Sequence, residues 1–486
     1  MTTFWRVALV YGFLALFHGL GATRSCRILA VGASGGGSRR SRRRGFQYFS
    51  LLSQRRHPPR DPNPPPTIED LEEQATNNNE VIDVVLDQIL GVNGGVVIDR
   101  YIPSRAWLWN QWYASVFSNA MSTTIRNMVA SFGLCCLMRR AIFGDWKVWK
   151  YPVSAVAAKA PTEALLLRLL DVFGTLWSSL LPLTTVVLAL FVTQAYNFWI
   201  SVYHLCRNIQ GRMSDIELVL ATSVGRKTNG VTHPNLFRPP GRGIRRRREA
   251  SSYTPSAEAF LDETTHQLRA FHVLFWASQA RRFRILLTDR GMSRLVAKGI
   301  LAQREKELLD LQLGVPKTQK HWILLESVAL GCREARQTDK KTRRRVVLEG
   351  GNGLEHCLLD KICSLRTSCN QITNQIAGRM PLSYVQFVQV LVDFFLFLVP
   401  LAHYKGLGLW AVLSTGILSI FYSGLLDLAY DFLDPLMDDK EYKGSGKDGD
   451  NGDDHCAVYF DLAVLIREST AAAHRWINAG AKLGRR

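Results

Sequence analysis

The sequence lacks the common signatures of soluble metal and nucleotide chemistry. None of its nine cysteines forms a CxxC pair, and no His/Cys spacing matches a zinc site. There is no GxxxxGK[ST] phosphate loop and no HExxH motif, and the histidines are scattered. These absences remove the most recognisable enzyme classes. The cysteines are interpreted as buried free thiols of a reducing compartment.

Acidic residues are missing from the first 60 positions. That segment contains 11 Arg but no Lys, Asp or Glu. In the rest of the chain, 49 basic residues exceed the 41 acidic ones by 8, whereas the whole chain carries a formal charge of +19. The remainder does not combine basic clusters with stacking aromatic residues, as single-strand binders do. Nucleic-acid binding is therefore not expected.

Residues 1–60 are typical of a targeting sequence. Val7–Gly21 is an apolar stretch of 15 residues, too short for a membrane span but suited to a signal-peptide core. Residues 23–60 are rich in Arg and Ser, like a transit peptide. The combination resembles plastid presequences of algae whose plastids have extra membranes, although the usual aromatic residue after the cleavage point is missing. The alternative is a secretory signal with a basic, proline-rich linker. Residues 61–104 are predicted to be a linker with an N-terminal helix.

Charged residues are also missing, or nearly so, from four internal windows, which predicts membrane spans. The windows are Val116–Met138, Val172–Cys206, Gln386–Tyr404 and Gly406–Leu426. Arg126 interrupts the first window, and Asp393 interrupts the third. Because charges facing lipid are costly, Arg126 should face protein, a water-filled lumen or the interface. Asp393 is either a functional residue or the partner of Arg126.

The remaining blocks predict an all-α fold. The spans form two pairs, 105–206 and 380–436, around a helical domain at 207–379. A repeat of steps of three and four within that domain predicts the seam of a packed helix pair. Its members are Leu358, Ile362, Leu365, Cys369, Ile372 and Ile376. The basic loop 226–250 is predicted to be disordered, with binding to an anionic membrane surface as the alternative. Residues 437–486 should form an acidic flexible insertion followed by a C-terminal helix.

Three carboxylates recur on one face at the end of the last span. Asp427, Asp431 and Asp434 are three or four residues apart, so they share a side of the helix. Like charges at this spacing repel, and the helix dipole disfavours acids at a C-terminal end. The pattern predicts a cation nearby, either a metal ion or basic side chains of a neighbour. A solvated acidic helix end remains the alternative.

Several short motifs occur in the order known from one family of membrane proteins. They are Ala195-Tyr196-Asn197-Phe198-Trp199, Pro381-Leu382-Ser383-Tyr384, Leu407-Gly408-Leu409-Trp410, Asp434-Pro435 and the tail segment Asp461–Arg467. Together they resemble the bestrophin anion channels, particularly the plant, algal and bacterial branch, over about residues 105–475.

The resemblance implies a homo-pentamer with four transmembrane helices per subunit, a helical cytosolic or stromal body and a central pore. The family's pore neck is lined by apolar side chains of the second span, which here fall at Pro182, Val186 and Leu190. Such an apolar ring gates by dewetting. The alternative is that these residues simply pack against neighbours or lipid.

Animal members of the family hold calcium after the fourth span. The matching positions are Asp431, Asp434 and Asp439, whose oxygens suit a hard cation. Lys440 and Tyr442 replace acids of the animal pattern, so calcium is a possible ligand and no other cofactor is expected.

The sequence thus predicts a bestrophin-like channel, not an enzyme, that passes chloride and/or bicarbonate across a plastid thylakoid membrane. Other endomembranes or the plasma membrane are the alternative locations. A membrane-anchored metal-dependent enzyme and a non-conducting scaffold are the alternative functions. The preference between chloride and bicarbonate and the gating stimulus do not follow from the residues.

Overall fold

The computed structural model describes residues 79–91, 95–98, 104–105, 116–143, 161–226, 253–311, 314–336, 347–436 and 458–482, all within one compact unit of residues 75–486. The predicted presequence, nearly all of the basic loop 226–250 and the acidic insertion with Asp439 lie outside these ranges.

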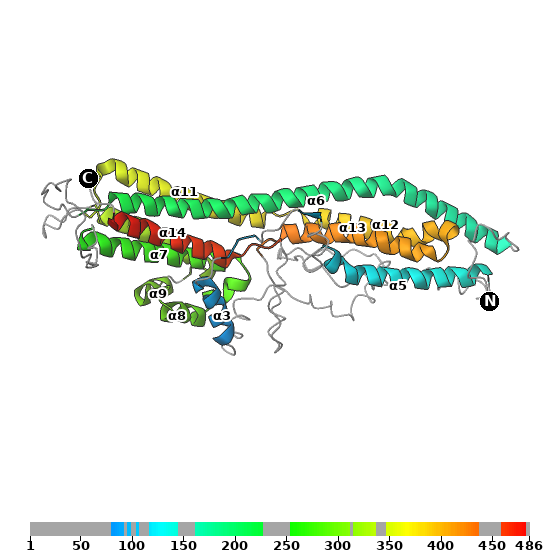
Figure 1. Ribbon diagram of the computed structural model, residues 1–486, viewed down its shortest axis with the longest axis horizontal. Helices are drawn as coiled ribbons and strands as arrows, with labels where there is room; N and C mark the ends of the chain where they lie inside the picture. Colours follow the sequence, from blue (N-terminus) through cyan, green and yellow to red (C-terminus); the bar gives the residue numbers. More distant parts are fainter. Residues whose placement is uncertain are drawn as a thin grey trace, which may run out of the picture. The chain divides into compact units, whose positions relative to one another are not determined.

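Every regular element of the described residues is helical, apart from two isolated β-bridges (Figure 1). The predicted all-α fold is therefore confirmed for this part of the chain. The α-helices are α3 (Asn79–Leu90), α5 (Val116–Phe143), α6 (Pro161–Ser223), α7 (Pro255–Gln279), α8 (Asp289–Ala297), α9 (Gln303–Asp310), α10 (His321–Glu334), α11 (Gly351–Ala377), α12 (Leu382–Leu407), α13 (Trp410–Leu433) and α14 (Leu462–Lys482). The short 3-10 helices are η2 (Arg282–Leu287) and η3 (Lys317–Gln319).

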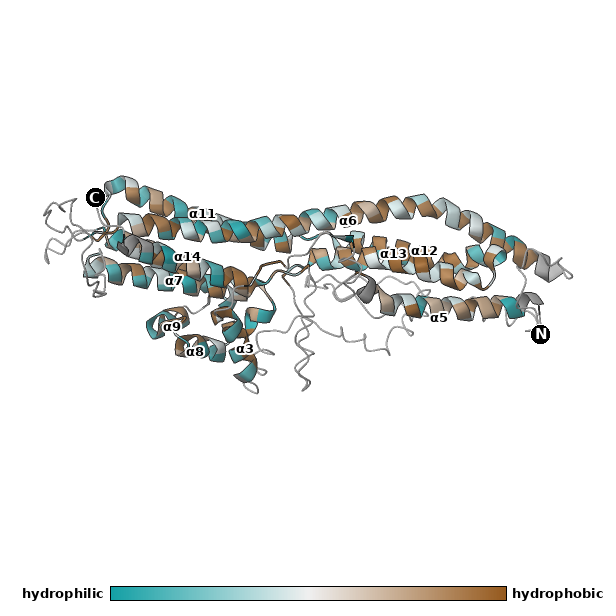
Figure 2. Ribbon diagram, viewed as in Figure 1, coloured by the Kyte–Doolittle hydropathy of each residue, from teal (hydrophilic) through white to brown (hydrophobic). Residues whose placement is uncertain are grey.

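Among the described helices, three contain segments long and apolar enough to cross a membrane. They are Leu165–Ser223 of α6, Leu382–Leu407 of α12 and Trp410–Leu433 of α13, and Figure 2 shows the brown, hydrophobic residues along them. Helix α5 covers the predicted first span but is not one of these three. Three candidate spans are thus shown, and a fourth in each subunit stays a proposal.

Helix α6 is much longer than a membrane is thick. Its 63 residues form one helix (Figure 1). At 1.5 Å per residue it extends about 95 Å, against roughly 30 Å for the hydrocarbon core of a bilayer. It therefore runs without a break through the boundary predicted at 206/207. The residues that would line the neck and the start of the helical body share one rigid element.

The apolar helices form their own core. Leu188, Phe191 and Ala195 of α6 are fully buried against a set of residues from α12 and α13. That set consists of Val388, Val392, Phe395, Leu396, Val399, Leu426, Ala429 and Leu433. A turn of two residues links α12 to α13, and Gly408 supports it with a φ of 59°, which L side chains rarely adopt.

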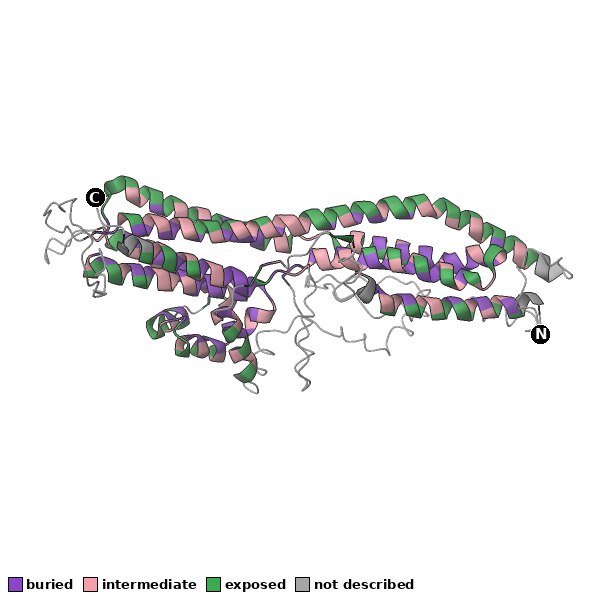
Figure 3. Ribbon diagram, in the orientation of Figure 1, coloured by how far each residue is buried: buried purple, intermediate pink, exposed green. Residues whose placement is uncertain are grey.

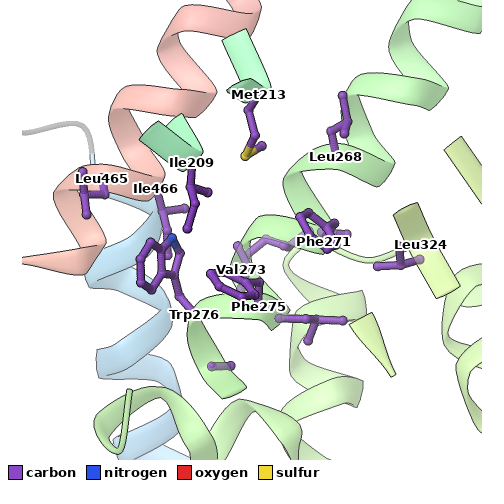
Figure 4. Packing of buried hydrophobic residues seen from close by; sticks show 14 of the residues in the cluster. Ile209, Met213, Leu268, Phe271, Val273, Phe275, Trp276, Leu324, Leu465 and Ile466 are labelled. Atoms are coloured by element: carbon purple, nitrogen blue, oxygen red, sulfur yellow. The ribbon is translucent and has the colours of Figure 1, made fainter. Parts of the chain in front are cut away.

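A second core holds the helical body together. The far half of α6 buries Ile209 and Met213 in the same cluster as Phe271 and Trp276 of α7 and Ile466 of α14 (Figure 4). The N-terminus of α7 is fixed by Thr254, whose hydroxyl accepts the backbone N–H of Ala257.

Helix α11 packs on α6 through the predicted seam. Leu358, Ile362, Leu365, Cys369 and Ile372 are buried, and Ile376 is half-buried. The prediction of a packed helix pair is thus confirmed. The prediction of buried thiols is wrong for Cys357 and Cys363, which lie on the exposed face of α11.

Candidate pore-lining face of helix α6

The three predicted neck residues lie on the exposed side of α6. Pro182 is exposed, and the exposed fractions are 58% for Val186 and 55% for Leu190. At about 100° per residue, steps of four keep the three side chains within an arc of about 80° and space them about 6 Å apart along the axis. They point away from the core formed with α12 and α13. We call this side of the helix the neck face.

Polar residues continue the neck face on both sides of the apolar stretch. Thr175 and Ser179 precede it, Thr193 and Asn197 follow it, and all four are exposed. Each lies within about 20° of the direction of Val186. The face is therefore polar, then apolar for about 12 Å, then polar again.

The hydroxyls of these flanks donate to the helix's own carbonyls. Thr175 Oγ1 donates to the Asp171 carbonyl at 3.0 Å, Ser179 Oγ donates to the Thr175 carbonyl at 2.9 Å, and Thr193 Oγ1 donates to the Ala189 carbonyl at 2.8 Å. These bonds satisfy the hydroxyl donors locally. The exposed amide of Asn197 would lack such partners in lipid, where an unpaired polar group is costly. A water-filled conduit fits this face better than acyl chains do.

Contacts with neighbouring helices hold the orientation of α6. Thr185 Oγ1 is hydrogen-bonded to the Tyr422 hydroxyl of α13 at 2.8 Å. The ring of Trp177 stacks on Phe395 of α12, with centroids 5.4 Å apart. Because other sides of α6 contact two helices, the neck face stays turned outward.

Pro182 is the one proline inside α6. A proline in a helix removes a backbone hydrogen bond and bends the helix. Figure 1 shows α6 as a curved helix. A small change of helix direction at Pro182 would therefore move Val186 and Leu190.

An aromatic cluster surrounds α6 directly after the neck. Trp199 stacks on Tyr196 and Tyr203 of α6 and contacts Phe432 and Phe460. The Trp199 indole N–H also donates to the Val458 carbonyl at 2.7 Å. The motif that contributed to the family resemblance therefore joins α6, the end of α13 and the segment before α14.

The acidic end of α13 is bound by protein side chains. Arg379 donates to both carboxylate oxygens of Asp434, at 3.2 and 3.3 Å, and the Tyr459 hydroxyl donates to Asp431 at 3.1 Å. Within the described residues no group of three His, Cys, Asp or Glu side chains could hold a metal ion. Arg379 is one of the basic neighbours that the carboxylate pattern allowed. With Asp439 outside the described residues, the calcium site stays a prediction.

The two charges expected inside the spans lie in the same region. Asp393 of α12 accepts a hydrogen bond from Gln389 and interacts electrostatically with Arg126 of α5 and Asp427 of α13. The structure therefore brings Arg126 and Asp393 together across two helices.

The sequence reasoning did not pick out the polar flanks. Their signal was readable, because Thr175, Ser179, Thr193 and Asn197 keep the helical spacing of the neck residues. It also did not find that Lys405 of α12 binds both carboxylate oxygens of Asp171, at 2.6 and 2.8 Å. That pair joins helices far apart in the sequence, so no local pattern announces it.

No protein-family model matches the chain, and no curated protein matches it. Several solved structures are similar to the chain. A bacterial bestrophin homologue from Klebsiella pneumoniae is similar at 10% identity with a TM-score of 0.46, covering 73% of this chain and 98% of that chain. A point variant of the Klebsiella homologue is similar at 10% identity with a TM-score of 0.47, covering 73% and 99%. A crystal structure described as a membrane protein is similar at 11% identity with a TM-score of 0.44, covering 62% and 87%.

Because these identities are near 10%, the function is inferred from the residues of α6. The family named by the Klebsiella structures is the family that the sequence motifs resemble.

Proposed function

We propose that this protein is a bestrophin-like channel that passes chloride and/or bicarbonate through a conduit lined by the neck face of α6. The observation that carries the proposal is the pattern of that face. Its apolar residues Pro182, Val186 and Leu190 are exposed, and polar residues extend the face in both directions. The pattern is that of a narrow dry constriction between wetter segments.

An apolar constriction of about 12 Å controls passage through its own hydration. Water leaves such a constriction readily, and an ion passes only if it can shed part of its water shell or if the constriction fills. Val186 and Leu190 offer no group that replaces the lost water. The neck therefore favours weakly hydrated ions and acts as a gate.

The charges near the neck face do not oppose the passage of anions. Along α6 no acidic residue occurs between Asp171 and Asp215. Asp171 is bound by Lys405, and Asp215 is bound by Lys361 at 3.1 Å. Both acids that border this long stretch are thus neutralised by lysines. A face without uncompensated negative charge does not concentrate cations, so it presents no electrostatic barrier to anions.

Closure of the conduit requires several copies of the chain, because one α6 helix provides only one wall. The family resemblance supports a homo-pentamer with α6 innermost and α5, α12 and α13 towards the lipid bilayer. The composition of residues 1–60 supports delivery to a plastid, and a thylakoid membrane is the proposed location. Chloride and bicarbonate remain the two proposed permeant ions.

The proposal is tested by reconstituting the purified full-length protein in planar bilayers and measuring reversal potentials under chloride and bicarbonate gradients. We expect currents that reverse near the anion equilibrium potential. A reversal near the cation potential would refute the anion preference. Complete absence of current would favour a scaffold or a membrane enzyme.

Two valines of similar exposure allow the effect of a substitution in the neck to be compared with its effect on the lipid-facing surface. Val186 of α6 and Val390 of α12 have nearly the same exposed fraction, 58% and 56%. We expect Val186→Ser to increase the single-channel conductance, because a hydroxyl helps the constriction to hold water. Val390→Ser should leave the conductance unchanged. Equal effects of the two substitutions would contradict the proposed lining.

A further inference from the structure

The same side of α6 is exposed in the neck and at the point where the helix enters the body. Beyond the neck, the residues that α6 buries are Val202, Cys206, Ile209, Met213, Ile216 and Leu220. At about 100° per residue these point to the same side as Leu188, Phe191 and Ala195, which α6 buries against α12 and α13. The neck face thus continues into the body, and Figure 3 shows exposed and intermediate residues, in green and pink, along α6.

Two exposed side chains of the body follow the direction of the neck. His204 lies 18 residues after Val186, which is five helical turns or about 27 Å, so the two side chains point the same way. Asn208 follows within about 40° of that direction. Both are exposed. An ion that leaves the neck along α6 therefore meets Asn197, then His204, then Asn208.

His204 is the first side chain on this route that can carry a charge. Between Val172 and Cys206, α6 has no Asp, Glu, Lys or Arg. The next charged residue, Arg207, forms an ion pair with Glu468 of α14, and Gln210 donates to the same carboxylate at 2.9 Å. The ring of His204 touches only that of Tyr203 among the described aromatic contacts, with centroids 5.8 Å apart. Its imidazole is left facing the route.

We propose that position 204, five turns beyond Val186 on the neck face, determines the preference of the inner part of the ion path for anions over cations. The inference rests on the proposed function and extends it from the neck to the body. In an assembly of several copies, His204 repeats around the axis, so a charge placed there acts several times on one passing ion.

The test places a charge at position 204 by chemical modification of an open channel. His204→Cys is made in a background in which Cys26, Cys357, Cys363 and Cys456 are changed to Ser. A cationic and an anionic methanethiosulfonate reagent are applied from the side of the body while the current is recorded. We expect the cationic reagent to raise the chloride conductance and the anionic reagent to lower it, each on the order of twofold. His474→Cys, an exposed position on α14, is the matched control and should respond to neither.

Val186→Cys in the same background distinguishes a failure of the inner segment from a failure of the neck. If cysteine at 186 is modified with loss of current while cysteine at 204 gives no change, the path leaves α6 after the neck and the present inference is wrong. If neither position responds, the proposed function itself fails. Equal changes at 204 and 474 would show an effect on the surface charge of the body rather than on the ion path, and would also overturn the inference.

Discussion

Asn127 of α5 donates a hydrogen bond from its amide to the Ser419 hydroxyl of α13 at 2.6 Å. One turn further along, Ser131 and Thr415 are hydrogen-bonded at 3.2 Å. These bonds lie in an interface of small residues, the kind that lets helices approach closely in a membrane. They explain how α5, which is less apolar than α12 and α13, can pack closely against α13 with several of its polar side chains hydrogen-bonded.

The close approach of α5 and α13 predicts a severe effect of a larger residue at Gly416. A Cβ there would lie 2.7 Å from Met128 Sδ of α5. We expect Gly416→Leu to destabilise the subunit by about 1–3 kcal/mol or to expel α5 from its place. The measurement is the thermal midpoint of the purified protein in detergent. Ile417→Leu, on the adjacent exposed position, is the control and should leave the midpoint unchanged.

The helices of the core were predictable because their signals are local. Windows with at most one charged residue marked the apolar parts of α6, α12 and α13, and the periodic seam of α11 marked its buried side. Both signals depend only on residues a few positions apart, which share one face of a helix.

The pairings between helices could not be predicted in the same way. Arg379 and Asp434 are 55 residues apart, and Asn127 and Ser419 are 292 apart. Polar residues on a helix face show that a partner is needed, but only the tertiary arrangement decides which partner it is. For the same reason the acidic end of α13 left a metal ion and a basic neighbour as open alternatives.

A buried acid on the far half of α6 predicts a pH-dependent stability. Glu217 is only 5% exposed, and burial raises its pKa to about 8. The folded protein therefore keeps this carboxyl protonated at neutral pH, whereas the unfolded chain ionises it near 4.5. Stability contributed by the proton is full below about pH 4.5 and falls as the pH rises towards 8.

We expect Glu217→Gln to remove this loss and to stabilise the protein by roughly 2–4 kcal/mol at pH 8. The measurement is the thermal midpoint as a function of pH. Glu263→Gln, at an exposed position of α7, provides the comparison and should keep the pH dependence of the unmodified protein. A Glu217→Gln profile parallel to the unmodified one would show that Glu217 is not protonated in the folded state.

The pairing of Arg379 with Asp434 ties α13 to the segment between α11 and α12. Both side chains are about one-third exposed, so solvent weakens the pair. We expect Arg379→Gln to lower the free energy of unfolding by only about 1 kcal/mol. Arg366→Gln, on the exposed face of α11, should change it less. If Arg366→Gln lowered the free energy of unfolding more than Arg379→Gln does, the ion pair of Arg379 and Asp434 would make no specific contribution to stability.

Calcium control at Asp431, Asp434 and Asp439 predicts that chelation by EGTA alters the open probability in bilayers. Asp439→Asn is the informative variant, because Asp434→Asn would also break the bond to Arg379. The calcium proposal requires that Asp439→Asn abolish the response to EGTA. Gating that is the same with and without the chelator would rule the calcium site out.

The proximity of Arg126 and Asp393 distinguishes two roles for the acid within α12. If the two residues mainly compensate each other, Arg126→Gln and Asp393→Asn should each destabilise the protein, and the double substitution should cost less than their sum by about 1 kcal/mol. Such coupling is measured by a double-mutant cycle on the free energy of unfolding. If Asp393 instead faces the permeating ion, Asp393→Asn should shift the reversal potential while Arg126→Gln does not. We expect coupling without a shift, because Asp393 interacts with Arg126 of α5 and Asp427 of α13, whereas the neck face belongs to α6.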